Sequence, residues 1–349
     1  MRLHSLFNDP NAVLVALRPV PDVPSHDDFR GASAHALAAI GFELDGERVV
    51  IKPNVTSGEM FADPDSGITT HPQFVHGMAD YLLQHGAHRC GISILEDPRN
   101  TDDDTPRHWR GTGYPEVAAA VGADLVWPNA ANCVTRTVRQ PHAFEAIRVS
   151  GHAVDPEAVL INVPKFKTHN LAITTLCMKN LMGTVYTPDR HFCRQAWLDI
   201  PEHERGGTRR PEDPFDVQLH ERWQEGLARR LIDTAQVVTP QLNLVEGVVG
   251  RDGTGFRNGA NFALGLAVAG INMVAVDTVA TYLMGFDPSS VVYLRMAGEA
   301  GLGPNTMESL RVYVARDGSP QPCEDPETLR ARPAFRVISR LPDAEHIAV

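Results

Sequence analysis

Four lysines are the residues whose type is most informative about chemistry. The chain has 349 residues and 32 basic side chains, of which only Lys52, Lys165, Lys167 and Lys179 are lysines, so the other 28 are arginines. A chain that supplies its surface positive charge with arginine keeps lysine where a compact, titratable or nucleophilic amine is needed. The alternative is that these four lysines remain in the sequence by chance and have no special role. Because three of them lie within 15 residues, we favour the functional interpretation.

The segment 164–183 carries the strongest constellation. Lys165, Lys167 and His169 alternate after an apolar run, so they share one side of an extended segment, and a following helix could return Lys179 to the same place. Amines and an imidazole suit an anionic substrate. Lys179, His169 and Lys167 are therefore the candidate catalytic groups, by proton transfer or by a Schiff base on Lys179, in isomerase- or lyase-type chemistry. The simpler alternative is that Lys179 and Asn180 only cap a helix.

Further side chains could hold the substrate. Lys52 and Asn54 close a short buried strand, and Arg251 lies in a glycine-rich segment, where it could clamp an anion. Thr70 stands before a predicted helix, where it could help to bind an anion and also serve as the N-cap, since the two roles are compatible. With Lys165 and Asn180, these form the predicted substrate-binding set.

Carboxylates also close predicted strands. Glu96, Asp97 and Glu246 could bind a divalent metal ion, accept a proton or orient a lysine. The acidic run 102–104 is better explained as a solvated loop. For Asp277, a structural contact within a helix and a functional role are equally plausible.

The order of predicted elements defines the fold class. Apolar runs at 13–17, 49–53 and 91–95 alternate with helical patterns, and the same rhythm returns after residue 156. This alternation predicts an α/β fold with parallel or mixed sheets covered by helices. We expect two lobes, residues 1–155 and 156–349, with the active site in the cleft between them and a polar insertion or lid at about 186–220.

Composition narrows the class of protein. A net charge of −11 argues against nucleic acid as a partner, and no apolar run approaches the 18 residues that suggest a membrane span. Five cysteines form no C-x-x-C pair, which makes an iron–sulfur cluster an unexpected cofactor. With no leader peptide in evidence, we expect reduced thiols and a cytoplasmic location. The sequence leaves open whether the protein forms a homo-oligomer.

Several of these strings resemble the "domain of unknown function 362" (DUF362) family. The strings are residues 49–54, 165–169, 179–183, 246–259 and 274–288, and the resemblance spans about residues 45–305. It implies an α/β fold. Many members carry ferredoxin-type cysteine motifs, which this chain lacks.

A more remote resemblance is to the nickel-pincer lactate racemase family. Its members have a histidine followed ten residues later by a lysine that holds the cofactor, and His169 and Lys179 match this spacing. The family's Gly-Gly before that lysine is replaced by Cys177 and Met178. The resemblance implies a two-lobed fold in which Lys179 and His169 face the substrate.

These observations predict an enzyme that acts on a small anionic carboxylate or phosphate, and they suggest a role in specialised metabolite biosynthesis. Two alternatives are a metal-dependent transferase or lyase that uses the carboxylates, and a non-catalytic carrier of a cofactor or metal.

Overall fold

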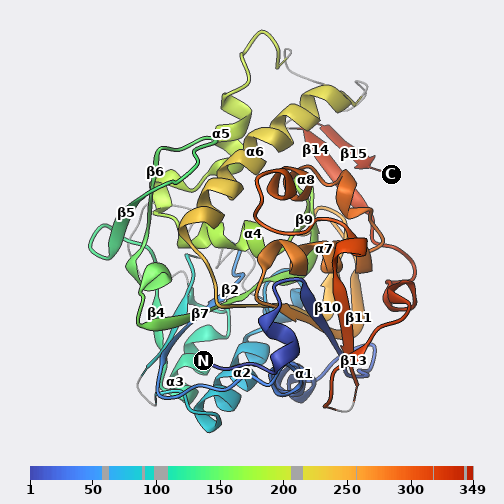
Figure 1. Cartoon of the computed structure of the whole chain (residues 1–349). Coiled ribbons are helices and arrows are strands. Elements are labelled where there is room, and N and C mark those ends of the chain that lie inside the picture. Colours follow the sequence, from blue (N-terminus) through green and yellow to red (C-terminus); the bar gives the residue numbers. More distant parts are fainter. Residues whose placement is uncertain are drawn as a thin grey trace.

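The central feature of the fold is a large mixed β-sheet. The computed structural model describes residues 1–56, 63–88, 91–97, 109–205, 215–256, 258–316, 318–341 and 344–348 (Figure 1). Nine strands follow one another in the order β13-β12-β1-β11-β10-β7-β2-β3-β4. In addition, β8 pairs with β10, and β9 pairs with β8. Their bounds are β1 Ala12–Leu17, β2 Arg48–Pro53, β3 Ile92–Leu95, β4 Asp124–Val126, β7 Ala158–Val163, β8 Lys165–His169, β9 Ile173–Thr175, β10 Leu242–Arg251, β11 Asn261–Gly270, β12 Arg311–Ala315 and β13 Gln321–Pro322.

Both faces of this sheet are buried, because successive side chains of a strand point into two different hydrophobic cores. In β1, Val13 and Val15 join one hydrophobic core, whereas Leu14 and Ala16 join the other. β2, β3, β4 and β7 run parallel to one another, and β11 is antiparallel to both β1 and β10. Strands that are apolar on both faces require helices on both sides, which is why the sequence shows nearly continuous apolar runs.

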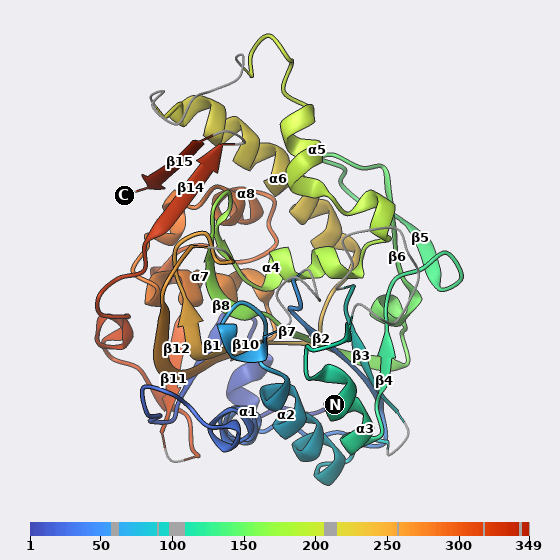
Figure 2. The same ribbon diagram turned by 180° about the vertical axis from the view of Figure 1, so that it is seen from behind.

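Helices cover the sheet on both faces, as Figures 1 and 2 show. α1, α2 and α3 lie on one side, and α4 to α8 lie on the other. The bounds are α1 His26–Ile40, α2 Pro72–Gln84, α3 Tyr114–Val121, α4 Cys177–Asn180, α5 Phe192–Leu198, α6 Val217–Val237, α7 Met273–Leu283 and α8 Val292–Glu299. The mixed α/β class predicted from the sequence is confirmed. In the described part of the chain, no helix is both long and apolar enough to cross a bilayer.

The sheet is continuous across the predicted lobe boundary at residue 155. β7, which follows that boundary, lies between β2 and β10, and the N-terminal β1 pairs with β11 and β12. The division into two lobes therefore stays a prediction, but the strands on its two sides form one sheet. Two short hairpins stand apart from it, β5 Cys133–Thr137 with β6 Ala146–Ser150, and β14 Val337–Leu341 with β15 Ala344–Ala348.

One predicted loop is wrong. The sequence suggested that the strand containing residues 242–245 ends at Glu246 and that a glycine-rich loop follows, but β10 continues to Arg251 and pairs with β11. The glycines mark a β-bulge between Gly247 and Val249, where the carboxylate of Glu246 accepts the N–H groups of Val248 and Val249. Glycine inside a strand commonly has this meaning.

The predicted insertion at 186–220 has regular structure where it is described. It contains a short 3₁₀ turn, Thr187–Asp189, then α5, and then the start of α6. Residues 206–214 lie outside the described residues, as does the acidic run 102–104.

Candidate active site

The candidate site lies at the carboxyl ends of the central parallel strands. Asn54 follows β2, and Glu96 and Asp97 follow β3, its neighbour in the sheet. Open α/β sheets place their ligand crevices at these ends. A cavity of about 620 Å³ lies here.

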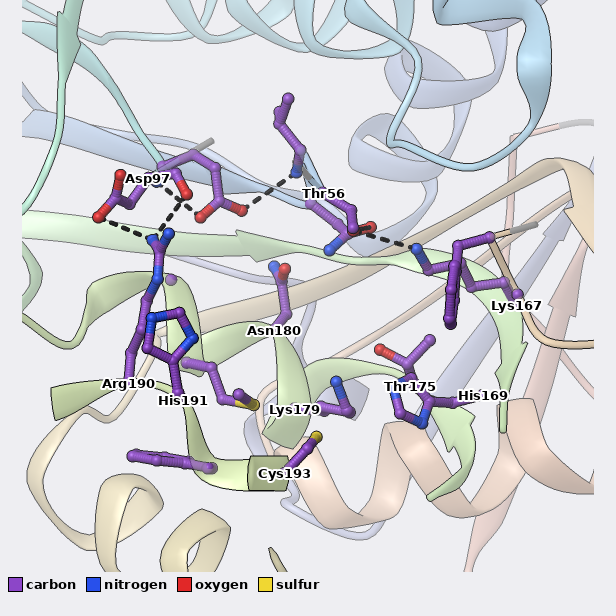
Figure 3. A pocket seen from close by; sticks show the side chains of 18 of the residues that line it. Thr56, Asp97, Lys167, His169, Thr175, Lys179, Asn180, Arg190, His191 and Cys193 are labelled. Carbon is purple, nitrogen blue, oxygen red and sulfur yellow. Dashed lines mark hydrogen bonds and ion pairs between the residues drawn. The ribbon is translucent and has the colours of Figure 1, made fainter. Parts of the chain in front are cut away.

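Segments far apart in the sequence line this cavity (Figure 3). β8 contributes Lys167 and His169, and α4 contributes Lys179 and Asn180. Of the sequence-predicted residues, those that line it are Asn54, Glu96, Asp97, Lys167, His169, Lys179 and Asn180. Those that are not among its described lining residues are Lys52, Thr70, Lys165, Glu246 and Arg251.

Lys52 forms a buried ion pair with Glu96, and other acceptors take its remaining N–H groups. Its Nζ donates to Glu96 Oε2 at 2.7 Å, to the carbonyl of Pro53 at 2.8 Å and to Asn180 Oδ1 at 3.4 Å, and the residue is 0% exposed. Burial lowers the pKa of Lys52, and the carboxylate of Glu96 opposes that shift. These three acceptors occupy all three N–H groups of the ammonium form of Lys52, so none is left for a substrate in this structure.

Lys165 is likewise neutralised, by Glu246. The two residues are register partners in the parallel pair β8–β10, and they are 1% and 0% exposed. Glu246 also accepts the backbone N–H of His71, at the start of α2. The anion-binding position predicted at this helix N-terminus is thus filled by a carboxylate of the chain itself.

Thr70 has a structural role. Its hydroxyl donates to the carbonyl of Val163 at 2.7 Å and accepts the N–H of Asn54 at 3.0 Å. The N-cap of α2 is His71, whose Nδ1 accepts the N–H of Gln73, so the predicted capping by Thr70 is wrong by one residue.

Lys167 differs from these two lysines because no carboxylate in the described part of the chain pairs with it. Its Nζ donates to the carbonyl of Ile68 at 2.7 Å and to Thr56 Oγ1 at 3.4 Å, and the residue is only 4% exposed. Burial, followed by the positive charges of Lys179 and Lys165, holds the pKa of Lys167 well below its ordinary value. A neutral amine in this place uses two hydrogens for these acceptors and keeps a lone pair.

This lowered pKa predicts a pH dependence of stability. Between the folded-state pKa of Lys167 and the ordinary value of 10.5, the unfolded chain binds more protons at this residue than the folded chain. The wild type should therefore gain stability relative to Lys167→Met as the pH rises from 7 to 10. Urea unfolding of both proteins across this range measures the difference. A difference that stays constant, or that falls with pH, would contradict a lowered pKa.

Lys179 presents its amine to the cavity. Asp277 from α7 accepts the N–H groups of Cys177 and Met178 at 2.7 and 3.0 Å, which caps the four-residue helix α4 and fixes the place of Lys179. Asp277 is thus a structural contact, one of the two roles that the sequence left open. The Nζ of Lys179 has no hydrogen bond or ion pair with any residue that the structure describes, and the side chain is half-buried.

His169 is held as a hydrogen-bond donor. Its Nδ1 accepts the N–H groups of Leu171 and Ala172 at 3.0 and 3.1 Å, so the proton of the neutral ring is on Nε2. Desolvation and the charges of Lys179 and Lys167 hold the pKa of His169 well below its ordinary value. The β8–β9 hairpin that presents it contains Ile173 at φ +67°, a conformation that β-branched residues rarely adopt. The geometry favours a fixed donor over the proton-transfer group predicted from the sequence.

The carboxylates predicted as metal ligands are already engaged. Glu96 and Glu246 pair with Lys52 and Lys165, and Asp97 accepts Arg190 Nη1 at 2.7 Å. Each of these acids therefore already has a cationic partner, which a divalent ion would have to displace.

A different group of possible ligands lies elsewhere. Among the residues that the structure describes, one group of three histidine, cysteine or acidic side chains has its potential ligand atoms within 4.8 Å of one another. It consists of His26, Asp65 and His71. His71 Nδ1 accepts the N–H of Gln73, so its Nε2 carries the proton and donates to Asp65 at 3.1 Å. This tautomer leaves His71 no free lone pair for a metal.

Arg251 lies away from the cavity lining, and its guanidinium donates to Asn261 at 2.8 Å and to the carbonyl of Ser66 at 3.3 Å. The predicted anion clamp is therefore a contact between β10 and the loop before α2. Asn180 is at the cavity but is oriented by the chain, since its amide nitrogen donates to the carbonyl of Lys52 and to Asn162.

Gly183 permits the close approach of the 179–183 segment to the Lys52–Glu96 pair. A Cβ there would lie 1.9 Å from Glu96 Oε1 and 2.7 Å from Lys52 Nζ. We expect Gly183→Ala to displace this buried pair and to lower the free energy of unfolding by about 1–3 kcal/mol. Urea unfolding measures this, and a variant as stable as the wild type would show that the pair can move freely.

Sequence reasoning missed one wall of the cavity. Arg190, His191, Cys193 and Arg194 line it from the predicted lid, and Phe256 lines it from the loop after β10. Arg190 also donates to the carbonyl of Asp97, which ties this wall to the end of β3. The long polar segment was the one sequence feature that indicated such a wall.

The family assignment rests on a match over most of this region. The family described as "Domain of unknown function (DUF362)" matches residues 49–282, which is more than half of the chain. The chain belongs to the DUF362 family. The matched region contains every site residue predicted from the sequence, and it confirms the resemblance seen there.

Individual relatives are distant. A thylakoid-associated protein from Synechocystis sp. is 26% identical to this DUF362 chain over 271 residues, which cover 76% of this chain and 72% of the relative. A solved protein from Thermotoga maritima aligns with 67% of this chain at 8% identity and a TM-score of 0.38. The alignment spans about half, 52%, of that protein.

Proposed function

We propose that this protein is an enzyme that binds an anionic carboxylate or phosphate in the 620 Å³ cavity and acts on it with a lysine amine. The observation that carries the proposal is the imbalance of charge on the cavity wall. Its two described carboxylates, Glu96 and Asp97, are each matched by a cation, Lys52 and Arg190. Lys167 and Lys179 face the cavity with no carboxylate partner among the described residues.

Lys179 thus leaves an unmatched positive charge on the cavity wall of a chain whose net charge is −11, and Lys167 adds a second amine beside it. An anionic ligand would restore the balance, and charge-assisted hydrogen bonds to it would be stronger than neutral ones. Small-molecule sites typically have volumes of about 300–1,000 Å³ and a few convergent polar groups. The cavity fits this description.

The geometry also supports a division of roles. Lys167, with its lowered pKa, is suited to act as a base or nucleophile. Lys179 and the Nε2–H of His169 are suited to hold the anion. The sequence grouped Lys179, His169 and Lys167 together as catalytic, and the greater burial of Lys167 favours it as the reacting amine.

Amine-directed labelling with an anionic aldehyde tests the proposal. The protein is treated with pyridoxal 5′-phosphate: the neutral amine attacks the aldehyde carbon, water leaves, and borohydride reduces the resulting imine to a stable secondary amine. We expect the label on Lys167 or Lys179, and we expect inorganic phosphate to protect against it.

The chain supplies its own control, because its other two lysines, Lys52 and Lys165, are buried in ion pairs. Because the chain has only four lysines, peptide mass mapping identifies the labelled lysine without ambiguity. Label confined to Lys52 or Lys165, no label on any of the four, or label that phosphate does not reduce would refute the anionic site.

The alternative of a metal-dependent transferase or lyase has less support, since its proposed ligands are already paired. The carrier hypothesis shares the anionic site and differs from the proposal in predicting that the bound anion leaves chemically unchanged. We place the activity in the cytoplasm as part of the proposal, supported by the free state of Cys133, Cys177, Cys193 and Cys323.

A further inference from the structure

We infer that the anionic ligand carries an apolar, ring-sized body in addition to its acidic group. The inference rests on the proposed function and specifies the class of substrate. A bare acetate or phosphate would occupy a small part of 620 Å³, whereas cavities of this size usually enclose ligands of drug size.

Apolar side chains line the cavity beside the amines. Met182 comes from the 3₁₀ turn after α4, Cys193 comes from α5, and Phe256 comes from the loop after β10. All three are half-buried, so part of their apolar surface stays open to the cavity. Covering such surface is the main favourable contribution to binding of an apolar group.

The backbone brings Phe256 next to the donor His169. Gly255, at φ +76°, lies so close to β8 that a Cβ would be 2.0 Å from the carbonyl oxygen of Thr168. This approach puts the ring centroids of Phe256 and His169 6.4 Å apart. An aromatic or acyl group could therefore lie against Phe256 while its acidic group reaches His169 and Lys179.

The cavity extends from the two amines to a second group of side chains, so it has room for an extended ligand. Figure 3 shows Lys167 and His169 at one end, Arg190 and His191 at the other, and Cys193 on the side of Lys179. Arg190 is tied to Asp97, so its charge is already matched. Lys167 and Lys179 thus place two amines together at one end of the cavity, and the uncharged side chains of Met182, Cys193 and Phe256 line it beside them.

Isothermal titration calorimetry with matched probes tests this inference. We compare 2-naphthoate, benzoate, acetate and the neutral 2-naphthalenemethanol. We expect the Kd of 2-naphthoate to be at least tenfold lower than that of acetate, with benzoate between them, and 2-naphthalenemethanol to bind at least tenfold more weakly than 2-naphthoate.

Variants locate the apolar contact. Phe256→Ser and Met182→Gln should each weaken 2-naphthoate several-fold and leave acetate unchanged. Val23→Ser, which removes an apolar side chain that is 85% exposed, is the matched control and should change neither.

The outcomes separate this inference from the proposed function. If acetate and inorganic phosphate bind and 2-naphthoate binds no more tightly, the apolar body is refuted and the anionic site stands. If 2-naphthoate and its neutral alcohol bind equally, or if 2-naphthoate does not bind, the inference is also refuted.

Discussion

Replacing Lys179 with glutamine should make Lys167 markedly less reactive. The positive charge of Lys179 is one of the causes that lower the pKa of Lys167. Without that charge the pKa of Lys167 rises, and a smaller fraction of its amine is neutral at a given pH. We therefore expect acetic anhydride to acylate Lys167 more slowly in Lys179→Gln than in the wild type. Competitive labelling with peptide mass mapping measures this rate.

Lys179→Arg is the matched control, because it keeps the charge and changes the headgroup. We expect its Lys167 to react at nearly the wild-type rate. Binding of inorganic phosphate gives a second readout, which should be lost in Lys179→Gln and largely kept in Lys179→Arg. Equal reactivity of Lys167 in all three proteins would show that the two amines are not coupled.

Breaking the Lys165–Glu246 pair should have the largest effect on stability. Either Lys165→Met or Glu246→Gln leaves a buried partner without its counter-charge, because the two residues are 1% and 0% exposed. Removing one member of a buried pair typically costs about 3–5 kcal/mol. We expect losses of about this size in urea unfolding at 25 °C.

The double variant distinguishes charge pairing from general damage to the core. Removing both charges together leaves no uncompensated ion, so we expect Lys165→Met with Glu246→Gln to lose less than the sum of the single losses. Arg229→Met breaks an exposed pair with Glu225 on α6 and should cost less than about 1 kcal/mol. Additive losses at Lys165 and Glu246 would contradict the pairing argument.

The local pattern of the sequence determined most of the elements and part of the site. Apolar runs are local properties of the sequence, so β1, β2 and β3 were predicted nearly to the residue from the runs at 13–17, 49–53 and 91–95. The scarcity of lysine directed attention to Lys167 and Lys179, and the strand-end rule placed Asn54 at the same crevice.

Only the tertiary structure decided which lysines are available. Lys52 meets Glu96 44 residues away, and Lys165 meets Glu246 81 residues away. Both meetings depend on the order and register of strands in the sheet, which no local pattern encodes. The charge state and freedom of an amine are set by such partners within a few ångströms. The sequence could therefore name four lysines, and the fold separated the two that are neutralised from the two that face the cavity.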